Sequence, residues 1–478
     1  MNSERTAFRG LFLPLALTVI ALSGCAGASL EQSLSRTNEE AASFTGGQLA
    51  LAKTQEDENA RKKAATELLA RPLGQEAAVQ LALANSPALQ ALLAQHAADT
   101  ARAAKAGRLP NPIFSLQRLR VGDVLELDRM ISIGLLDLLT LPLRQQVAGQ
   151  QIEQERLRLT SDVVDQVSRV RQAWVRAVAA QQSLKYAGQV YESAEASAEL
   201  SRRMQAVGNF SKLQRARQQA FYADAGTQLA VAHYAATAAR EELVRQLGLT
   251  EGQAQELKLP ERLPDLPREP LQPAEVGQTA SRGRLDVRLA QAQFDTAARD
   301  RGLVRVTSIT DIELGGIRNT ISNGADGSKA TERDYEFALR LPLFDWGDLQ
   351  RDAANGQVLA SAQRLDATLR AAGSSLRQSY AAYRTTYDIA RHQRDEVVPL
   401  RKTISDENLL RYNGMLIGVF DLLADAREQV NAVMAEISAE QQFWLADAAL
   451  RAELIGRPMA SPVTPTSSAT AGSADTSH

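Results

Sequence analysis

The feature that most constrains the fold is a run of about 60 residues without proline, from 144 to 206. At 1.5 Å per residue, a helix of this length would be roughly 90 Å long, several times the usual length in globular proteins. Positions four and three apart along it are mostly apolar, as in the seam of a coiled coil: Val163, Val167, Val170, Trp174, Ala177, Gln181 and Leu184. We therefore predict a mostly α-helical protein with long coiled-coil helices.

The chain contains two copies of one pattern, about 200 residues apart, because Leu141-Pro142-Leu143 recurs as Leu341-Pro342-Leu343. Each copy predicts a helix, a β-hairpin, a long helix, a glycine break and a shorter helix. The first copy, 73–250, has a hairpin at about 113–136 and helices at 144–206 and 211–247. The second copy, 274–456, has a hairpin at about 308–343 and helices at 348–411 and 418–455. A proline-rich linker, 251–273, separates the copies, and the tail 457–478 is expected to be disordered.

The hairpin segments alternate between apolar and charged residues. Tyr335, Phe337 and Leu339 share one face, with Asp334, Glu336 and Arg340 on the other, and Asp311 and Glu313 alternate similarly with Ile312. Alternation over about ten residues is typical of transmembrane barrel strands, although each segment alone fits a half-exposed soluble strand equally well. Four strands cannot close a barrel, and open sheet edges in lipid leave backbone groups unpaired. If the strands lie in a membrane, several copies of the chain must complete the barrel.

The N-terminus has the order of a secretory signal peptide, predicted for 1–24. Arg5 and Arg9 precede an apolar run that ends in Leu22-Ser23-Gly24-Cys25, and a run of about 12 residues is too short to span a bilayer as a helix. The small residues before Cys25 resemble a bacterial lipobox, which implies acylation of Cys25, with palmitate among the acyl groups, and a lipidated segment 25–72. The alternative is an ordinary signal peptide with an incidental cysteine.

Composition argues against several classes of protein. The formal net charge is -2 and the pI is about 6.2, so no basic surface for nucleic acid is expected. The histidines are scattered, at positions 96, 233, 392 and 478, and the six methionines do not cluster, so neither a metal site nor a cofactor is predicted. No nucleophile–base pattern is evident, and we expect no enzymatic activity.

Several stretches, in their order and spacing, resemble the TolC family of outer-membrane efflux factors over about residues 73–455. The stretches are LGQEAAVQLALANSPAL from Leu73, GNFS from Gly208 with Gln214 and Arg217, GRLDV with Asp286, and RYNGMLIGVFDLLADAR from Arg411. The resemblance implies a homotrimer whose twelve-stranded β-barrel in the outer membrane continues as an α-helical periplasmic tunnel. Charged Asp311, Glu313, Glu336 and Arg340 would then face a water-filled lumen.

The resemblance also implies a function. The chain would be the outer-membrane channel of a tripartite efflux system, conducting small solutes passively from an inner-membrane pump, of the RND type, and a periplasmic adaptor (a membrane fusion protein). The alternative is an exported coiled-coil structural or adaptor lipoprotein that bridges envelope layers. The solute is not specified by the sequence.

The glycine breaks are implied to be the periplasmic tips of the tunnel. Residues of the turns that would dock the adaptor are Gly208, Asn209, Ser211, Gly414 and Gly418. Asp421 falls where members place a constricting ring of aspartates, although an aspartate after a turn is also a good helix cap. Tyr412 and Gln214 fall where members join neighbouring hairpins, and simple packing is the alternative for Tyr412. Ala424 and Ile417 depart from the family pattern, and Gly414-Met415 stands where alanine-glycine is usual.

Overall fold

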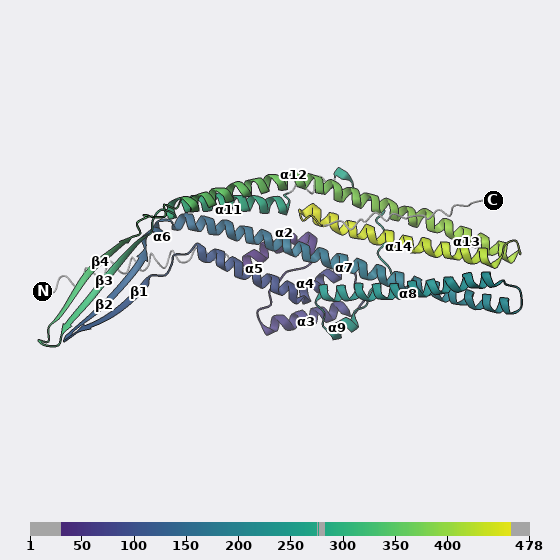
Figure 1. Ribbon diagram of the computed structural model, residues 1–478, viewed down its shortest axis with the longest axis horizontal. Helices are drawn as coiled ribbons and strands as arrows, with labels where there is room; N and C mark the ends of the chain where they lie inside the picture. Colours follow the sequence, from purple (N-terminus) through teal and green to yellow (C-terminus); the bar gives the residue numbers. More distant parts are fainter. Residues whose placement is uncertain (1–29, 275, 277–282, 460–478) are drawn as a thin grey trace. The chain divides into compact units, whose positions relative to one another are not determined.

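The computed structural model describes residues 30–274, 276 and 283–459 (Figure 1). The expected signal peptide, Cys25 and nearly all of the tail lie outside the described residues. The residues that the structure describes form two compact units, the first from the described parts of Met1–Glu40, Leu92–Thr160 and Leu285–Arg370 and the second from those of Ala41–Ala91, Ser161–Arg284 and Ala371–His478. Most of the described residues are helical, which confirms the predicted class.

The first unit contains one antiparallel sheet in the order β1-β2-β3-β4. The strands are β1 (Ile113–Val121), β2 (Val124–Gly134), β3 (Ile312–Asn323) and β4 (Lys329–Leu339). Two hairpins, β1–β2 and β3–β4, pair with each other along β2 and β3. In the first hairpin the turn is made by Gly122 at φ +58, a left-handed conformation that glycine adopts without strain. The sheet within one chain is open, with β1 and β4 at its edges.

The second hairpin differs in extent from the sequence prediction. Helix α11 (Leu285–Thr307) continues almost to the strand, so β3 begins at Ile312. It extends to Asn323 and so includes the first residues of the polar, glycine-bearing segment 319–331, which the sequence predicts as the loop of this hairpin. At the other end, Arg340 N–H still donates to Asp311 O at 3.0 Å, but the ladder then stops. Pro342 has no N–H to continue it, and residues 341–347 are an irregular link to α12 (Asp348–His392).

The same Leu-Pro-Leu motif behaves differently in the first copy. There the short helix α6 (Leu135–Leu139) is followed by α7 (Leu141–Ala206), one unbroken helix of 66 residues. Pro142 lies in the first turn of α7, where its missing N–H would have no helical partner in any case. The long helix expected from 144 to 206 is therefore present and begins slightly earlier.

Within the first unit, ion pairs join helices that are distant in sequence. Glu40 of α2 (Leu30–Thr45) accepts from Arg156 of α7 at 2.8 Å and from Arg288 of α11 at 3.1 Å. Burial alone would raise the pKa of Glu40, but the hydrogen bonds from the two arginines lower it below its ordinary value. Glu40 is thus held ionised between two helices.

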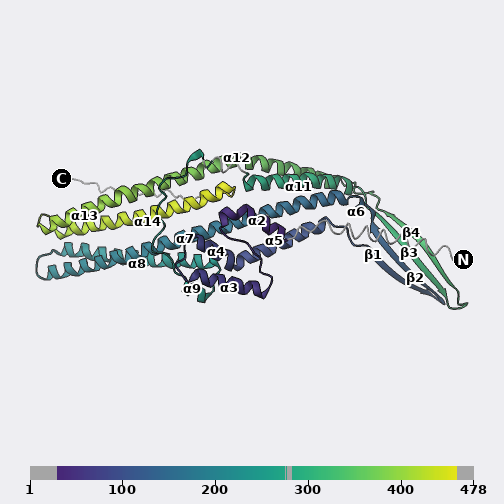
Figure 2. The same cartoon turned by 180° about the vertical axis from the view of Figure 1, so that it is seen from behind.

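The second unit consists of antiparallel helices. α8 (Lys212–Leu247) returns along the end of α7, and α14 (Val419–Ile455) returns along α13 (Val398–Asn413), as both views show (Figures 1 and 2). Shorter helices cover one side: α3 (Gln55–Leu69), α4 (Gln75–Asn85), the start of α5 (Pro87–Ala106) and α9 (Glu251–Glu256). In the described part of the chain no single helix is long and apolar enough to cross a bilayer, although α4 and α5, bent by 55°, meet that test as a pair.

The proline-rich linker is a packed strap. It begins with α9 and then follows α12 and α14, where Leu266 joins a buried cluster with Tyr383, Tyr387 and Phe443. Three aromatic side chains donate hydrogen bonds to backbone carbonyls of the strap: Trp444 Nε1 to Pro264 O at 3.1 Å, Tyr387 OH to Pro267 O at 3.0 Å and Tyr380 OH to Leu271 O at 3.1 Å. Prolines leave backbone carbonyls free to accept such bonds.

The long helix predicted from 348 to 411 is interrupted. A five-residue π-turn, η1 (Gln393–Val397), separates α12 from α13, and Val398 N–H donates to Gln393 O, five residues back. Pro399 explains the interruption, because its ring lacks an N–H and crowds the carbonyl four residues earlier. A π-turn accommodates that missing hydrogen bond.

Candidate functional site

The turn between α7 and α8 is a glycine-capped helix end followed by a capped helix start. Gly208 has φ +81, and Asn209 N–H donates to Met204 O at 2.9 Å, the hydrogen bond of a Schellman motif. Ser211 then caps α8: its side chain accepts from Gln214 N–H at 3.2 Å, and the Gln214 side chain accepts from Ser211 N–H at 2.9 Å. Two of the residues predicted for docking and gating, Ser211 and Gln214, thus form one capping box.

The turn between α13 and α14 has the same hydrogen bonds but a different residue in the left-handed position. Leu416 N–H donates to Arg411 O at 2.9 Å, and Met415, not Gly414, has positive φ, at +58. A side chain in this conformation is strained by about 1 kcal/mol or more. Met415 is also 93% exposed, so nothing within the described chain holds its side chain.

Asp421 lies in the first turn of α14. Its carboxylate accepts from Gly418 N–H at 3.1 Å, which makes Gly418 the N-cap and Asp421 the third residue of the helix. Because Gly418 has no side chain, Asp421 supplies the side-chain half of the capping interaction. Capping and a role at a constriction are compatible, since a helix N-terminus favours a negatively charged side chain.

Tyr412 is partly exposed at the end of α13. The side-chain oxygen of Gln214 accepts the hydrogen bond from Ser211 N–H in the capping box. Between residues that the structure describes, no hydrogen bond joins Tyr412 to Gln214. The contact between the two helical hairpins lies further from the tips, at Arg427: its guanidinium donates to Gln218 Oε1 at 3.3 Å and lies 3.5 Å from the ring centroid of Phe221. Burial lowers the pKa of Arg427. The sequence motif contains Arg427, but only the structure reveals its partners.

The GRLDV stretch contains, beside Asp286, a buried arginine whose ion pair the sequence did not predict. Asp286 lies in the first turn of α11 and accepts from Val287 N–H. Arg284 is buried and pairs with Glu453 of α14 at 2.7 Å, and Ser375 Oγ donates to the same carboxylate at 2.6 Å. The sequence predicts a helix from about residue 273 to 305 and so places Arg284 inside it, whereas α11 begins only at Leu285.

The sheet separates charges between its two faces. Following the register across all strands, one face, called here the acidic face, carries six carboxylates and no basic residue: Glu126, Asp128, Glu313, Glu332, Asp334 and Glu336. The opposite face, the aromatic face, carries Phe114, Ile131, Leu314, Tyr335 and Phe337 and has no carboxylate. Tyr335 is 89% exposed. The predicted alternation in the second hairpin therefore continues through the first hairpin.

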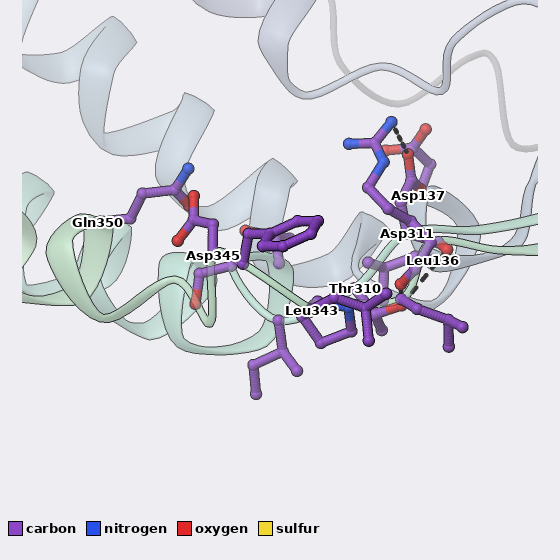
Figure 3. Close-up of a pocket in the computed structure, with 14 residues that line it drawn as sticks. Leu136, Asp137, Thr310, Asp311, Leu343, Asp345 and Gln350 are labelled. Carbon is purple, nitrogen blue, oxygen red and sulfur yellow. Dashed lines mark hydrogen bonds and ion pairs between the residues drawn. The ribbon is translucent and has the colours of Figure 1, made fainter.

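Where the sheet meets the helices, the first unit has a polar cavity of about 480 Å³ (Figure 3). Asp137 and Asp311 lie on one side of it and Asp345 and Gln350 on the other. Asp311 and Arg340 form an ion pair at 3.5 Å and lie just outside the ends of β3 and β4. Glu313 and Glu336, by contrast, lie within the acidic face. Beside the cavity, the link 341–347 exposes apolar side chains, including Phe344 and Trp346.

Among residues 30–274, 276 and 283–459, no group of three or more His, Cys, Asp or Glu side chains is arranged to hold a metal ion. His96 lies 3.9 Å from Glu155, and His392 lies 3.1 Å from Glu396. Each of these two histidines therefore lies near a carboxylate without belonging to such a group.

Residues 276–456 match the family model of outer membrane efflux proteins. A comparison with curated proteins found no match. Solved structures with a similar fold include a membrane protein from Pseudomonas aeruginosa, with TM-score 0.67, 20% identity and coverage of 82% of this chain and 93% of that one. The Campylobacter jejuni CmeC outer membrane channel has TM-score 0.67 and 15% identity, covering 86% and 89%. The open Neisseria gonorrhoeae MtrE outer membrane channel has TM-score 0.65 and 18% identity, covering 83% and 90%.

At these identities the solved structures establish the fold, which extends over both repeats. The family match establishes the sequence relationship over the second repeat. Together the family match and the fold confirm that the chain resembles the TolC-type outer-membrane efflux factors, as its sequence motifs indicate.

Proposed function

We propose that the chain is the outer-membrane channel of a tripartite efflux system and conducts small solutes passively out of the cell as a homotrimer. The observation that carries this proposal is the open sheet with one aromatic and one acidic face. In lipid, the unpaired edges β1 and β4 would each leave a row of backbone groups without partners. Pairing β4 of one copy with β1 of the next removes every edge, and three copies give twelve strands.

The side chains on the two faces indicate which face of such a barrel contacts lipid and which lines the lumen. The aromatic face contacts lipid, because carboxylates are expensive in a hydrocarbon environment. The acidic face lines the lumen, where water solvates its carboxylates and the negative charge favours cations. The link 341–347 then lies at the membrane surface. Its aromatic residues, Phe344 and Trp346, correspond to the aromatic girdles of barrels.

The helical hairpins form the periplasmic part of this proposal. Their tips, at Gly208 to Ser211 and Gly414 to Gly418, dock a periplasmic adaptor, which links the channel to an inner-membrane pump of the RND type. The exposed Met415 and neighbouring Leu416 support this assignment, since exposed apolar side chains at a turn are typical of contact surfaces. Acylation of Cys25 would add a lipid anchor in the same membrane.

Planar-bilayer recording tests the proposal. Purified oligomer should insert and conduct, and in a salt gradient its reversal potential should show a preference for cations. The double variant Glu313→Gln/Glu336→Gln should conduct with a weaker preference. Absence of conductance from a correctly assembled oligomer would refute the channel and favour an exported structural or adaptor lipoprotein.

A further inference from the structure

The aromatic face of the sheet carries an unusual concentration of arginine in its half nearer the hairpin turns. Register pairs Arg129 of β2 with Arg318 of β3, and Arg318 with Arg333 of β4, so three arginines lie side by side in one row across three strands. Two more, Arg118 and Arg120, follow on β1 of the same face. The row lies next to Tyr335, at the end of the apolar half.

This arrangement is unfavourable without a counter-ion. Side chains directly opposite each other on neighbouring strands have Cβ atoms about 5 Å apart, and like charges in these positions destabilise a sheet. The carboxylates of the sheet are all on the acidic face, so they cannot neutralise the arginines. In the described portion of the chain none of these five guanidinium groups forms an ion pair with a carboxylate.

The position of the arginines relative to the proposed membrane indicates which anions can neutralise them. The aromatic face is apolar from Leu339 and Ile312 to Tyr335, and the arginines begin only beyond this band. A basic side chain on the lipid-facing side of a barrel is costly at the midplane and nearly free at the interface. The arginines therefore lie at the level of the headgroups of the outer leaflet.

We propose that the row Arg129, Arg318 and Arg333, extended by Arg118 and Arg120, is a binding surface for phosphate-bearing lipid headgroups of the outer leaflet. A guanidinium donates two parallel hydrogen bonds to one phosphate, a geometry that an ammonium cannot match. Adjacent arginines on neighbouring strands can share the oxygens of one headgroup phosphate, which removes their mutual repulsion. This inference rests on the proposed function, because it requires the aromatic face to contact lipid.

Lipid retention by the intact oligomer tests the proposal. The oligomer is incubated in neutral detergent with a bis-phosphorylated glycolipid, diphosphoryl lipid A, and bound lipid is counted by native mass spectrometry. The triple variant Arg129→Gln/Arg318→Gln/Arg333→Gln should weaken retention by about tenfold or more, and raised salt should weaken wild-type retention. Inorganic phosphate alone should not bind measurably, because one headgroup engages several arginines together with the apolar band.

A matched control removes three charges from the other face. The variant Asp128→Asn/Glu332→Gln/Asp334→Asn should retain the lipid as the wild type does, but lose part of its cation preference in bilayer recordings. If the triple arginine variant does not assemble, the exposed single variants Arg318→Gln and Arg333→Gln are measured instead, and each should weaken retention.

The outcomes separate this proposal from the channel function. Unchanged lipid retention in the arginine variants overturns the inference and leaves the channel intact. Increased cation preference in those variants also overturns it, because the arginines would then line the lumen. Loss of conductance in the wild type would instead refute the proposed function.

Discussion

Glu440 should make the stability of the helical hairpins depend on pH. Glu440 lies on α14, where it faces the π-turn η1 and the linker strap. Burial, reinforced by the neighbouring negative charge of Glu436, raises the pKa of Glu440 from 4.5 to about 7. Arg394 of η1 and Arg262 of the strap act in the opposite direction, and Asp265 of the strap adds to the rise. Desolvation is the largest cause, so the carboxyl is more stable with its proton.

The direction of the pH dependence follows from linkage. In the folded protein Glu440 keeps its proton up to about pH 7, whereas the unfolded chain releases it near pH 4.5. The contribution of Glu440 to the stability of the folded state is therefore greatest below pH 4.5, decreases as the pH rises from 4.5 to 7, and changes no further above pH 7. The difference between the two pKa values would correspond to about 3 kcal/mol for a fully buried carboxyl. Because Glu440 is only partly buried, we expect about 1–2 kcal/mol.

The variant Glu440→Gln should remove this pH-dependent loss of folding stability, because its side chain does not ionise. At pH 8 its thermal midpoint, followed by far-ultraviolet circular dichroism in detergent, should exceed that of the wild type by about 2–4 °C. At pH 4.5 the two proteins should unfold at nearly the same temperature, because the wild-type carboxyl is then protonated in the folded protein and half protonated in the unfolded chain. Glu407→Gln, an exposed change on α13, is the matched control and should leave the midpoint unchanged. Equal midpoints for wild type and Glu440→Gln at pH 8 would refute the reasoning, as would a gain that persists undiminished at pH 4.5.

Three further predictions address separate parts of the molecule. Asp421→Asn keeps an oxygen for the Gly418 N–H but removes the charge, so it should weaken cation preference in bilayer recordings, whereas Asp421→Ala should additionally lower helix stability by about 1 kcal/mol; unchanged selectivity in both would reduce Asp421 to a cap. In Gly347→Ala the new Cβ would lie 2.2 Å from Ser308 O at φ +70, so the heat stability of the oligomer should fall by roughly 3 kcal/mol or more. Gly122→Ala, at φ +58 with open space around it, should cost only about 1 kcal/mol, and equal effects at the two sites would contradict this account. Cys25→Ser should abolish palmitate incorporation without changing helical content, and an acyl adduct that survives the substitution, detected by mass spectrometry, would rule out Cys25 as its site.

Local sequence signals predicted the elements well where the local sequence alone decides the conformation. The proline-free run up to Ala206 is one helix, and Gly208 ends it because a left-handed residue is needed there. Strand alternation in β4 also appears as predicted, since Tyr335 and Phe337 lie on one face and Asp334 and Glu336 on the other.

Features that depend on distant or competing residues were predicted less well. The extension of β3 to Asn323 depends on pairing with β2, which places Asn319 and Ile321 in a strand and not in the predicted loop. Pro399 was the local signal for the π-turn, but its effect on a helix depends on packing against α14. The prolines from Pro260 to Pro273 predict a non-helical chain, and the structure has no helix or strand from 257 to 272. The packing of this segment depends on three aromatic residues more than 100 positions away.

At the tips, the sequence placed Gln214 and Asp421 at functional turns without specifying their geometry. Both lie three residues after an N-cap and accept its N–H, a role that spacing from Ser211 and Gly418 could have indicated. The contact of Arg427 with Gln218 and Phe221 joins helices from the two repeats, and no local pattern predicts it.

We expect the four-stranded sheet to be stable in a membrane only when its edge strands, β1 and β4, pair with those of other copies of the chain. Native mass spectrometry of the protein extracted from outer membranes in mild detergent measures the number of copies directly. We expect a single species of three chains that dissociates only when the sheet unfolds. A monodisperse monomer that leaves the membrane fraction without detergent would contradict it.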